Sequence, residues 1–117
     1  MARNLLAWGF VKISFLDSSR VSYSNPVRQC LYTFEDSKNP NNEKAKIAAQ
    51  RLQEIFPLVE TRGINLKIPM PGHAIGSNEE AVKQILESSD QLEEEIKAHD
   101  VIFLLMDSRE SRWLPTV

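Results

Sequence analysis

The chain has 117 residues, a 42% share of hydrophobic residues and a formal net charge of −2 at pH 7. This length accommodates one domain with a modest core, and the near-balanced charge gives no reason to expect a nucleic-acid partner. The single cysteine, Cys30, excludes a disulfide framework or a cysteine-rich zinc site within the chain. No apolar run reaches the ~18–20 residues of a membrane span, and the first residues do not resemble a secretory signal. We therefore expect a soluble intracellular protein without a membrane span.

The first half of the chain shows a helix end, a strand and an irregular stretch. Residues 2–8 are typical of the end of a helix that Gly9 terminates. Residues 11–16 are dense in apolar and β-branched side chains, which indicates a strand. Residues 18–42 are rich in Ser, Asn and Pro without sustained periodicity, so we expect them to be irregular.

Two longer helices are predicted from apolar residues at helical spacing. The first covers residues 43–56 and ends before Pro57, and the second covers 77–98, where Ser77 and Glu80 fit a capping box. The apolar stripes expected to be buried are Ala45, Ala48, Ala49, Leu52, Ile55 and Phe56 in the first helix and Val82, Ile85, Leu86, Leu92 and Ile96 in the second.

Two further strands are predicted, at residues 63–70 and 101–106. The first alternates apolar and polar residues, which indicates one wetter face, and the second is a continuous apolar run of the kind buried in a parallel sheet. Three strands that alternate with helices predict an α/β fold with a Rossmann-like parallel sheet and right-handed crossovers.

Two acidic residues directly follow predicted strands: Asp17 after 11–16 and Asp107 after 101–106. Ligands of open α/β sheets bind at this edge, where Asp17 suits a ribose and Asp107 suits Mg²⁺ beside phosphates. The alternative interpretations are a turn residue for Asp17 and a helix N-cap for Asp107.

Arg28 and Lys44 are the candidate phosphate contacts. The planar donor fork of Arg28 fits phosphate oxygens, and Lys44 lies in the first turn of a predicted helix, where anions are favoured. The alternative for Lys44 is a solvated charge. Cys30 is followed by Leu31 and Tyr32, which look like packing residues, so we interpret it as a buried structural cysteine rather than a nucleophile.

Three strings resemble the adenylation domain of ubiquitin-like modifier-activating enzymes, a ThiF-type superfamily that includes bacterial sulfur-carrier activators. They are residues 23–29 (YSNPVRQ), 68–73 (IPMPGH) and 107–115 (DSRESRWLP), and together they are most similar to the autophagy branch of that family. The resemblance identifies residues 1–117 as a partial ThiF-type, ATP-binding adenylation domain.

The resemblance implies a role for each matching residue. Asp17 would hold the ATP ribose, whereas Asn25, Arg28 and Lys44 would contact the phosphates. Arg28 and Lys44 are the catalytic candidates, because they would neutralise charge as a modifier's terminal carboxylate attacks the α-phosphate. Gln29 belongs to the same motif and is expected to take part in binding the nucleotide.

The resemblance also implies cofactors, partners and a location. Asp107 would help to hold Mg²⁺ beside ATP. The partners would be the ubiquitin-like modifiers of autophagy and their conjugating enzymes, and the parent enzymes would act as homodimers. The expected location is the cytoplasm, which includes the site where autophagosomes form.

The chain departs from the family pattern in ways that predict a fragment. It contains no glycine-rich G-x-G-x-x-G turn, and the central first strand of the Rossmann order is missing. Lys44 lacks the family's Gly-Lys-Pro-Lys-Ala context, and the catalytic cysteine has no counterpart because Cys30 does not align with it. We therefore expect the 117-residue chain to be inactive in adenylation on its own.

Three other functions stay open. Another ThiF-type adenylating enzyme is disfavoured by the string RESRW at 109–113, and a nicotinamide-dependent oxidoreductase is disfavoured by the basic pair Arg28 and Lys44. A non-catalytic interaction or dominant-negative module would bind a modifier without dependence on ATP.

Overall fold

The computed structural model describes residues 1–70 and 79–117, which divide into two compact units, Met1–Asn65 and Leu66–Val117. The first unit contains α1 (Ala2–Ala7), β1 (Lys12–Leu16), a 3₁₀ turn (Asn25–Val27), α2 (Phe34–Lys38), α3 (Lys44–Ile55) and β2 (Glu60–Ile64). The second contains α4 (Glu79–Lys97), α5 (Glu110–Trp113) and a 3₁₀ turn (Leu114–Thr116). No helix of the described residues has both the length and the apolar character needed to cross a membrane.

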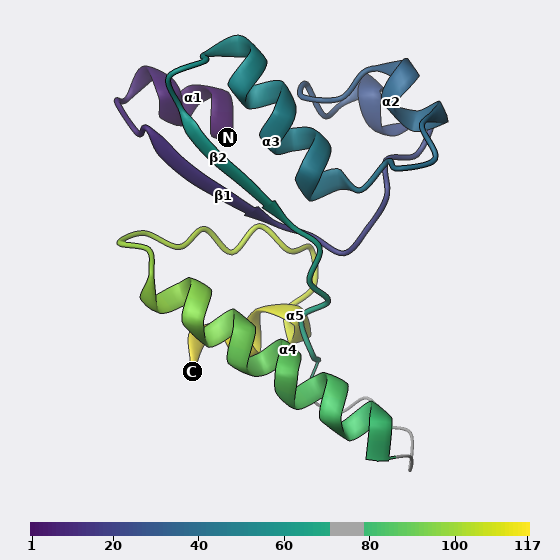
Figure 1. Ribbon diagram of the computed structural model, residues 1–117, viewed down its shortest axis with the longest axis vertical. Coiled ribbons are helices and arrows are strands. Elements are labelled where there is room, and N and C mark those ends of the chain that lie inside the picture. Colours follow the sequence, from purple (N-terminus) through teal and green to yellow (C-terminus); the bar gives the residue numbers. More distant parts are fainter. Residues whose placement is uncertain (71–78) are drawn as a thin grey trace. The chain divides into compact units, whose positions relative to one another are not determined.

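The predicted α/β class with a parallel sheet is confirmed. Within the described residues β1 and β2 form a two-stranded parallel sheet, and the register runs from Lys12 opposite Glu60 to Leu16 opposite Ile64 (Figure 1). A parallel pair cannot be joined by a tight hairpin, so the chain returns through α3, which packs on both strands.

The core of the first unit lies between α3 and the sheet. The predicted burial of Ala45, Ala48, Ala49 and Leu52 is confirmed, and Leu52 has no exposed surface. The predicted burial of Ile55 and Phe56 is wrong, because they are 47% and 38% exposed. The helix ends at Ile55 and Phe56 has an extended backbone, so the helical spacing no longer directs the Phe56 side chain toward the core.

Two glycines carry specific backbone requirements in the first unit. Gly9 has a φ of 90°, and the Phe10 and Gly9 amides donate to the Leu5 and Leu6 carbonyls, which makes the predicted helix stop a Schellman motif. Gly63 lies so close to α3 that an added Cβ would sit 2.4 Å from the Ala45 carbonyl oxygen. The close approach of β2 to the first turn of α3 therefore depends on Gly63.

The second strand lies earlier in the chain than the alternation predicts. It covers Glu60–Ile64, whereas residues 63–70 were expected, because pairing with the five residues of β1 sets its position. Backbone pairing does not need apolar side chains, and Glu60 contributes an exposed ion pair, with its Oε1 3.6 Å from Lys12 Nζ.

Residues 18–42 contain a helix that the sequence pattern did not indicate. A capping box formed by Thr33 and Asp36 begins α2, with the Asp36 amide donating to Thr33 Oγ1 and the Thr33 amide donating to the Asp36 carboxylate. The helix has five residues, which is too short for an apolar period to appear.

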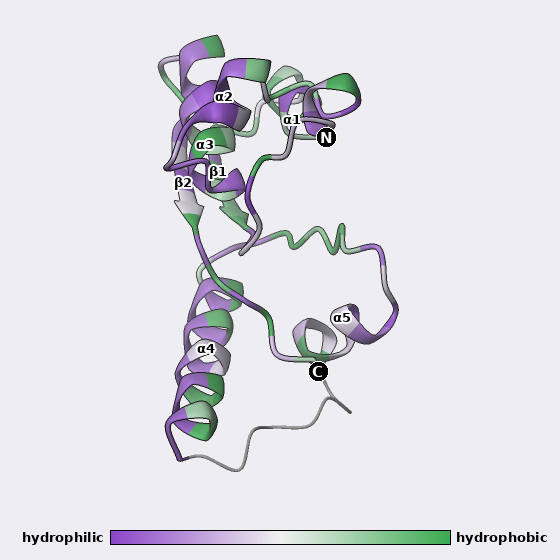
Figure 2. Ribbon diagram, turned by 90° about the vertical axis from the view of Figure 1, so that its right-hand side faces the viewer, coloured by the Kyte–Doolittle hydropathy of each residue, from purple (hydrophilic) through white to green (hydrophobic). Residues whose placement is uncertain are grey.

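The third predicted strand is wrong. Residues 101–106 form no strand, and Val101, Ile102, Phe103 and Leu105 are each 43% to 65% exposed. A strand needs a neighbouring edge for its hydrogen bonds, and the described part of the unit Leu66–Val117 contains no strand. The run appears as an unpaired hydrophobic stretch in Figure 2.

The predicted helix near residues 77–98 is present as α4, but most of its expected stripe is not buried. Only Leu92 is buried, Ile85 and Ile96 are half-buried, and Val82 and Leu86 are exposed. No strand lies within the described part of this unit to cover that face. The predicted capping box at Ser77 lies outside the described residues.

Candidate nucleotide site

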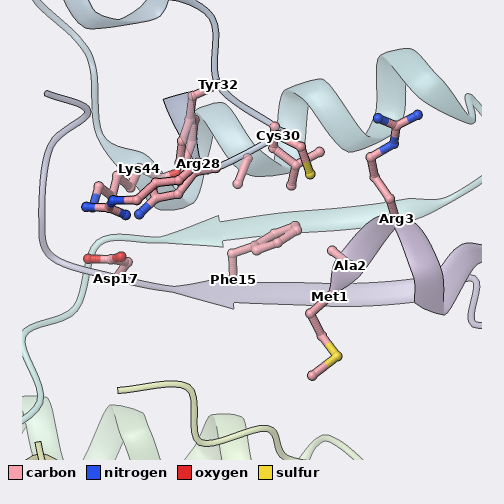
Figure 3. A pocket seen from close by; sticks show the side chains of 12 residues that line it. Met1, Ala2, Arg3, Phe15, Asp17, Arg28, Cys30, Tyr32 and Lys44 are labelled. Carbon is pink, nitrogen blue, oxygen red and sulfur yellow. The ribbon is translucent and has the colours of Figure 1, made fainter. Parts of the chain in front are cut away.

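The first unit contains a pocket of about 350 Å³ beside the carboxyl end of β1 (Figure 3). This volume falls in the range of small-molecule sites, about 300–1,000 Å³. Four predicted site residues line it: Asp17, Arg28, Gln29 and Lys44. Its other lining residues are Met1, Ala2, Arg3, Phe15, Cys30, Leu31, Tyr32 and Ala48.

Asp17 directly follows β1, and its amide donates to the Ile64 carbonyl of β2 at 3.2 Å. Its Oδ1 accepts hydrogen bonds from the Ser19 amide, at 2.8 Å, and from the Ser19 hydroxyl. The alternative role as a turn residue is therefore present in the structure. Both of these bonds use Oδ1, and no hydrogen bond from the described residues 1–70 and 79–117 reaches Oδ2.

Arg28 and Gln29 reach the pocket from the 3₁₀ turn at Asn25–Val27. Both of their amides donate to the Asn25 carbonyl, at 3.1 and 2.8 Å. Asn25 itself is buried, does not line the pocket, and accepts the Ser22 amide with its side-chain oxygen at 2.9 Å. The structure therefore gives Asn25 a turn-forming position, and its phosphate contact stays a prediction.

Lys44 is the first residue of α3 and is held through both of its backbone groups. Its amide donates to the Ser19 carbonyl at 3.0 Å, and its carbonyl accepts the Tyr32 hydroxyl at 3.2 Å. Its side chain lies beside that of Arg28 in Figure 3, with Asp17 below them. Three sequence segments thus bring an acid and two cations to one pocket.

Arg28 and Lys44, two of the three basic side chains that line the pocket, form no ion pair with carboxylates of the described residues. By contrast Lys46, on the same helix as Lys44, has its Nζ 2.6 Å from Glu43 Oε2. Two unpaired cations beside a pocket favour an anionic ligand.

Tyr32 is a pocket residue whose role the sequence did not indicate. Burial, together with the nearby carboxylates of Asp17 and Asp36, raises the pKa of Tyr32 to about 12. The phenol therefore stays protonated and remains a hydrogen-bond donor at neutral pH. An aromatic residue three positions after Gln29 was the available signal, but only the fold shows that it reaches Lys44.

The prediction that Cys30 is buried is wrong. Cys30 is exposed and lines the pocket. It lies in the irregular segment between the 3₁₀ turn and α2, and Figure 3 shows it among the residues that line the pocket.

An ion pair between the buried Asp36 and the half-buried Arg51 fixes α2 to α3 next to this segment. Arg51 Nη2 donates to Asp36 Oδ1 at 2.6 Å, and Arg51 Nη1 donates to Glu54 Oε2 at 2.7 Å. Burial opposes ionisation of Asp36, but hydrogen bonds from Arg51 and Thr33 outweigh it and hold the pKa of Asp36 below its usual value. The pKa of Arg51 is raised above its usual value by the bonds to Asp36 and Glu54.

Asp107 belongs to the second unit, Leu66–Val117, where it is exposed. The alternative role as a helix N-cap is wrong, because α5 begins at Glu110 and its N-cap is Arg109. The turn after Asp107 is fixed by Arg112, whose Nε donates to the Met106 carbonyl at 2.9 Å. The assignment of Mg²⁺ to Asp107 stays a prediction.

The first unit is an α/β fold with a pocket beside the carboxyl end of β1, and comparison with known families identifies the family of the chain. The model of the ThiF family matches residues 1–117, and the chain belongs to this family.

The relatives of the chain lie in one branch of activating enzymes. It is 56% identical to the ubiquitin-like modifier-activating enzyme ATG7 of Gallus gallus, 53% to that of Homo sapiens and 51% to that of Yarrowia lipolytica. Each match covers 100% of the chain but 16%, 17% and 19% of the relative. The resemblance to the autophagy branch is confirmed, and the chain spans less than a fifth of these relatives.

Proposed function

We propose that the chain forms one wall of an ATP site in a ubiquitin-like modifier-activating enzyme of autophagy. The observation that carries the proposal is the convergence of Asp17, Arg28 and Lys44 on one pocket from three separate segments. Membership of the ThiF family and the names of the relatives support it. The modifiers, their conjugating enzymes, homodimerisation and a cytoplasmic location belong to the same proposal.

The residues of the pocket fit the parts of a nucleotide. Asp17 Oδ2 is placed to accept a ribose hydroxyl, and Phe15 and Leu31 provide apolar surface in the same pocket. Arg28 and Lys44 would face the phosphates, where fixed cations stabilise the charge that develops when a carboxylate attacks the α-phosphate. Asn25 would support this site by holding the turn that carries Arg28, and Gln29 would line it.

Magnesium would act beside the phosphates by neutralising their oxygens. Asp107 is the proposed ligand, since Mg²⁺ prefers one or two carboxylates together with phosphate oxygens. The Asp107 carboxylate is exposed and therefore open to a cation.

Titration of the ¹⁵N-labelled chain with Mg-ATP tests the binding proposal. We expect the amide resonances of Asp17, Arg28 and Lys44 to shift. We expect Arg28→Ala or Lys44→Ala to raise the Kd for Mg-ATP about tenfold, because each removes a charged hydrogen-bonding partner. Lys46→Ala is the matched control, since Lys46 lies on the same helix, pairs with Glu43 and does not line the pocket. Equal losses for Lys44→Ala and Lys46→Ala would contradict the assignment.

We further propose that the 117-residue chain does not adenylate a modifier on its own, because its sequence contains no glycine-rich phosphate turn. An ATP–pyrophosphate exchange assay with a ubiquitin-like modifier measures this directly. We expect no exchange above background, and robust exchange would contradict the proposal.

A non-catalytic interaction module is the second candidate. The exposed apolar run at 101–105 favours it, because contiguous exposed apolar surface often marks a protein interface. Capture of a ubiquitin-like modifier that is equally strong with and without ATP would favour this function over nucleotide-dependent activation.

A further inference from the structure

We infer that Tyr32 is a positioning residue of the proposed ATP site: its hydroxyl fixes the segment that carries Arg28 against the residue that carries the second cation, Lys44. The inference rests on the proposed function and names a residue that acts on the phosphates through others. It is carried by the hydrogen bond from the Tyr32 hydroxyl to the Lys44 carbonyl, at 3.2 Å.

A chain of hydrogen bonds centred on Lys44 links the charged groups of the pocket. The Lys44 amide donates to the Ser19 carbonyl, and Ser19 in turn donates to Asp17. On the other side the Lys44 carbonyl accepts the Tyr32 hydroxyl, and the Tyr32 amide donates to the Gln29 carbonyl at 3.1 Å. Lys44 is thus attached both to the segment of Asp17 and to the segment of Arg28.

The bond between Tyr32 and Lys44 connects the segment that carries Arg28 to α3. Within the described residues it is the hydrogen bond that joins the segment 28–32 to α3, since the backbone bonds of that segment remain local. Arg28 is exposed and forms no ion pair within the described residues, and the Asp36–Arg51 ion pair holds α3 to α2, which begins only after Tyr32. Loss of the bond would let the separation of the two cations vary.

The donor remains available under the conditions in which a nucleotide would bind. Burial and the carboxylates of Asp17 and Asp36 disfavour ionisation of the phenol, so the hydroxyl keeps its proton at neutral pH. The Tyr32 ring also lines the pocket, next to Arg28 in Figure 3. Phenylalanine would keep this ring and remove only the bond to Lys44.

Because the energy of a phosphate between two cations depends on both distances, misplacing either cation weakens the pair. Tyr32→Phe should therefore raise the Kd for Mg-ATP about fivefold, which corresponds to one hydrogen bond of ordinary strength. The increase in Kd should occur only when the Lys44 ammonium is present, because the Tyr32 hydroxyl acts by fixing Arg28 relative to that cation.

A double-mutant cycle on the ¹⁵N-labelled chain tests the inference, with Mg-ATP as the probe. Tyr32→Phe and Lys44→Ala are combined, and the spectrum of each variant reports whether the fold is kept. We expect the loss from Tyr32→Phe to disappear in the Lys44→Ala background. Tyr23→Phe is the control, because Tyr23 is 67% exposed, does not line the pocket and packs on Phe34.

The outcomes separate the inference from the proposed function. An unchanged Kd for Tyr32→Phe, or an equal loss in both backgrounds, would overturn the inference while the ATP site stands. If the unaltered chain shows no Mg-ATP binding, the proposed function fails and the inference fails with it.

Discussion

The two compact units differ in how far similar apolar patterns become buried. In Met1–Asn65 the stripe of α3 packs on a sheet and Leu52 is fully covered, whereas in Leu66–Val117 the stripe of α4 is covered mainly at Leu92. Figure 2 shows hydrophobic residues along both helices. Helical spacing therefore predicts the helix in each unit, but burial follows only where a sheet faces it.

The largest effect on the free energy of unfolding is expected from truncating a side chain in the core of the first unit. Leu52→Ala should lower the free energy of unfolding by about 2–5 kcal/mol, because it leaves a cavity where the side chain was fully buried. Leu86→Ala, at a position 59% exposed on α4, should change it by less than about 0.5 kcal/mol. Urea unfolding followed by circular dichroism measures both, and similar losses would remove the contrast between the units.

A smaller effect is expected where β2 meets α3. Gly63→Ala should cost about 1–3 kcal/mol, because the new Cβ would meet the backbone of Ala45 and Lys46 and force it to shift. Gly9→Ala is the comparison: its Cβ meets nothing within 4 Å, so it should cost only about 1 kcal/mol through its positive φ. Urea unfolding ranks the two, and the reverse order would contradict the close packing.

The ion pair between Asp36 and Arg51 in the first unit should contribute to the free energy of unfolding, and this contribution should decrease in acid. The lowered pKa of Asp36 means that its stabilisation is present above the unfolded pKa and is lost as the pH falls through the folded value. Asp36→Asn should cost about 1–3 kcal/mol at neutral pH, and this cost should shrink in acid. Unfolding curves across acidic pH measure the trend.

The matched variant in the second unit is Glu93→Gln, which breaks an exposed ion pair with Lys97 on α4. Exposed pairs contribute little, so no resolvable change in unfolding is expected. A cost equal to that of Asp36→Asn would show that burial does not decide the strength of these pairs.

A smaller effect than those of Leu52, Gly63 and Asp36 is expected for Tyr32. Tyr32→Phe should lower the free energy of unfolding by about 1 kcal/mol at neutral pH, the usual worth of one hydrogen bond. Because its folded pKa of about 12 exceeds the ordinary value of 10.0, the Tyr32 contribution is complete below about pH 10 and is lost as the pH rises through 12. Unfolding of the unaltered chain and of Tyr32→Phe should be compared as the pH rises. The difference between their free energies of unfolding should become smaller at alkaline pH, and a constant difference would contradict the raised pKa.

Local patterns predicted those elements that depend on neighbours in the chain. The helix α3 with its buried residues from Ala45 to Leu52, the apolar run of β1 and the stop at Gly9 are each confirmed, whereas Ile55 and Phe56 are exposed. The predictions failed where a second segment decided the outcome. The position of β2 follows from its pairing with β1, and residues 101–106 form no strand without a partner edge.

The sequence by itself determined the family, because the strings at 23–29, 68–73 and 107–115 are recognisable local motifs, and it gave the residue types of the candidate site. Only the tertiary structure decided which of them meet. Asp17, Arg28 and Lys44 share a pocket because parallel pairing and the packing of α3 bring their segments together. The bond from Tyr32 to Lys44 spans twelve residues of sequence, so no local pattern could reveal it.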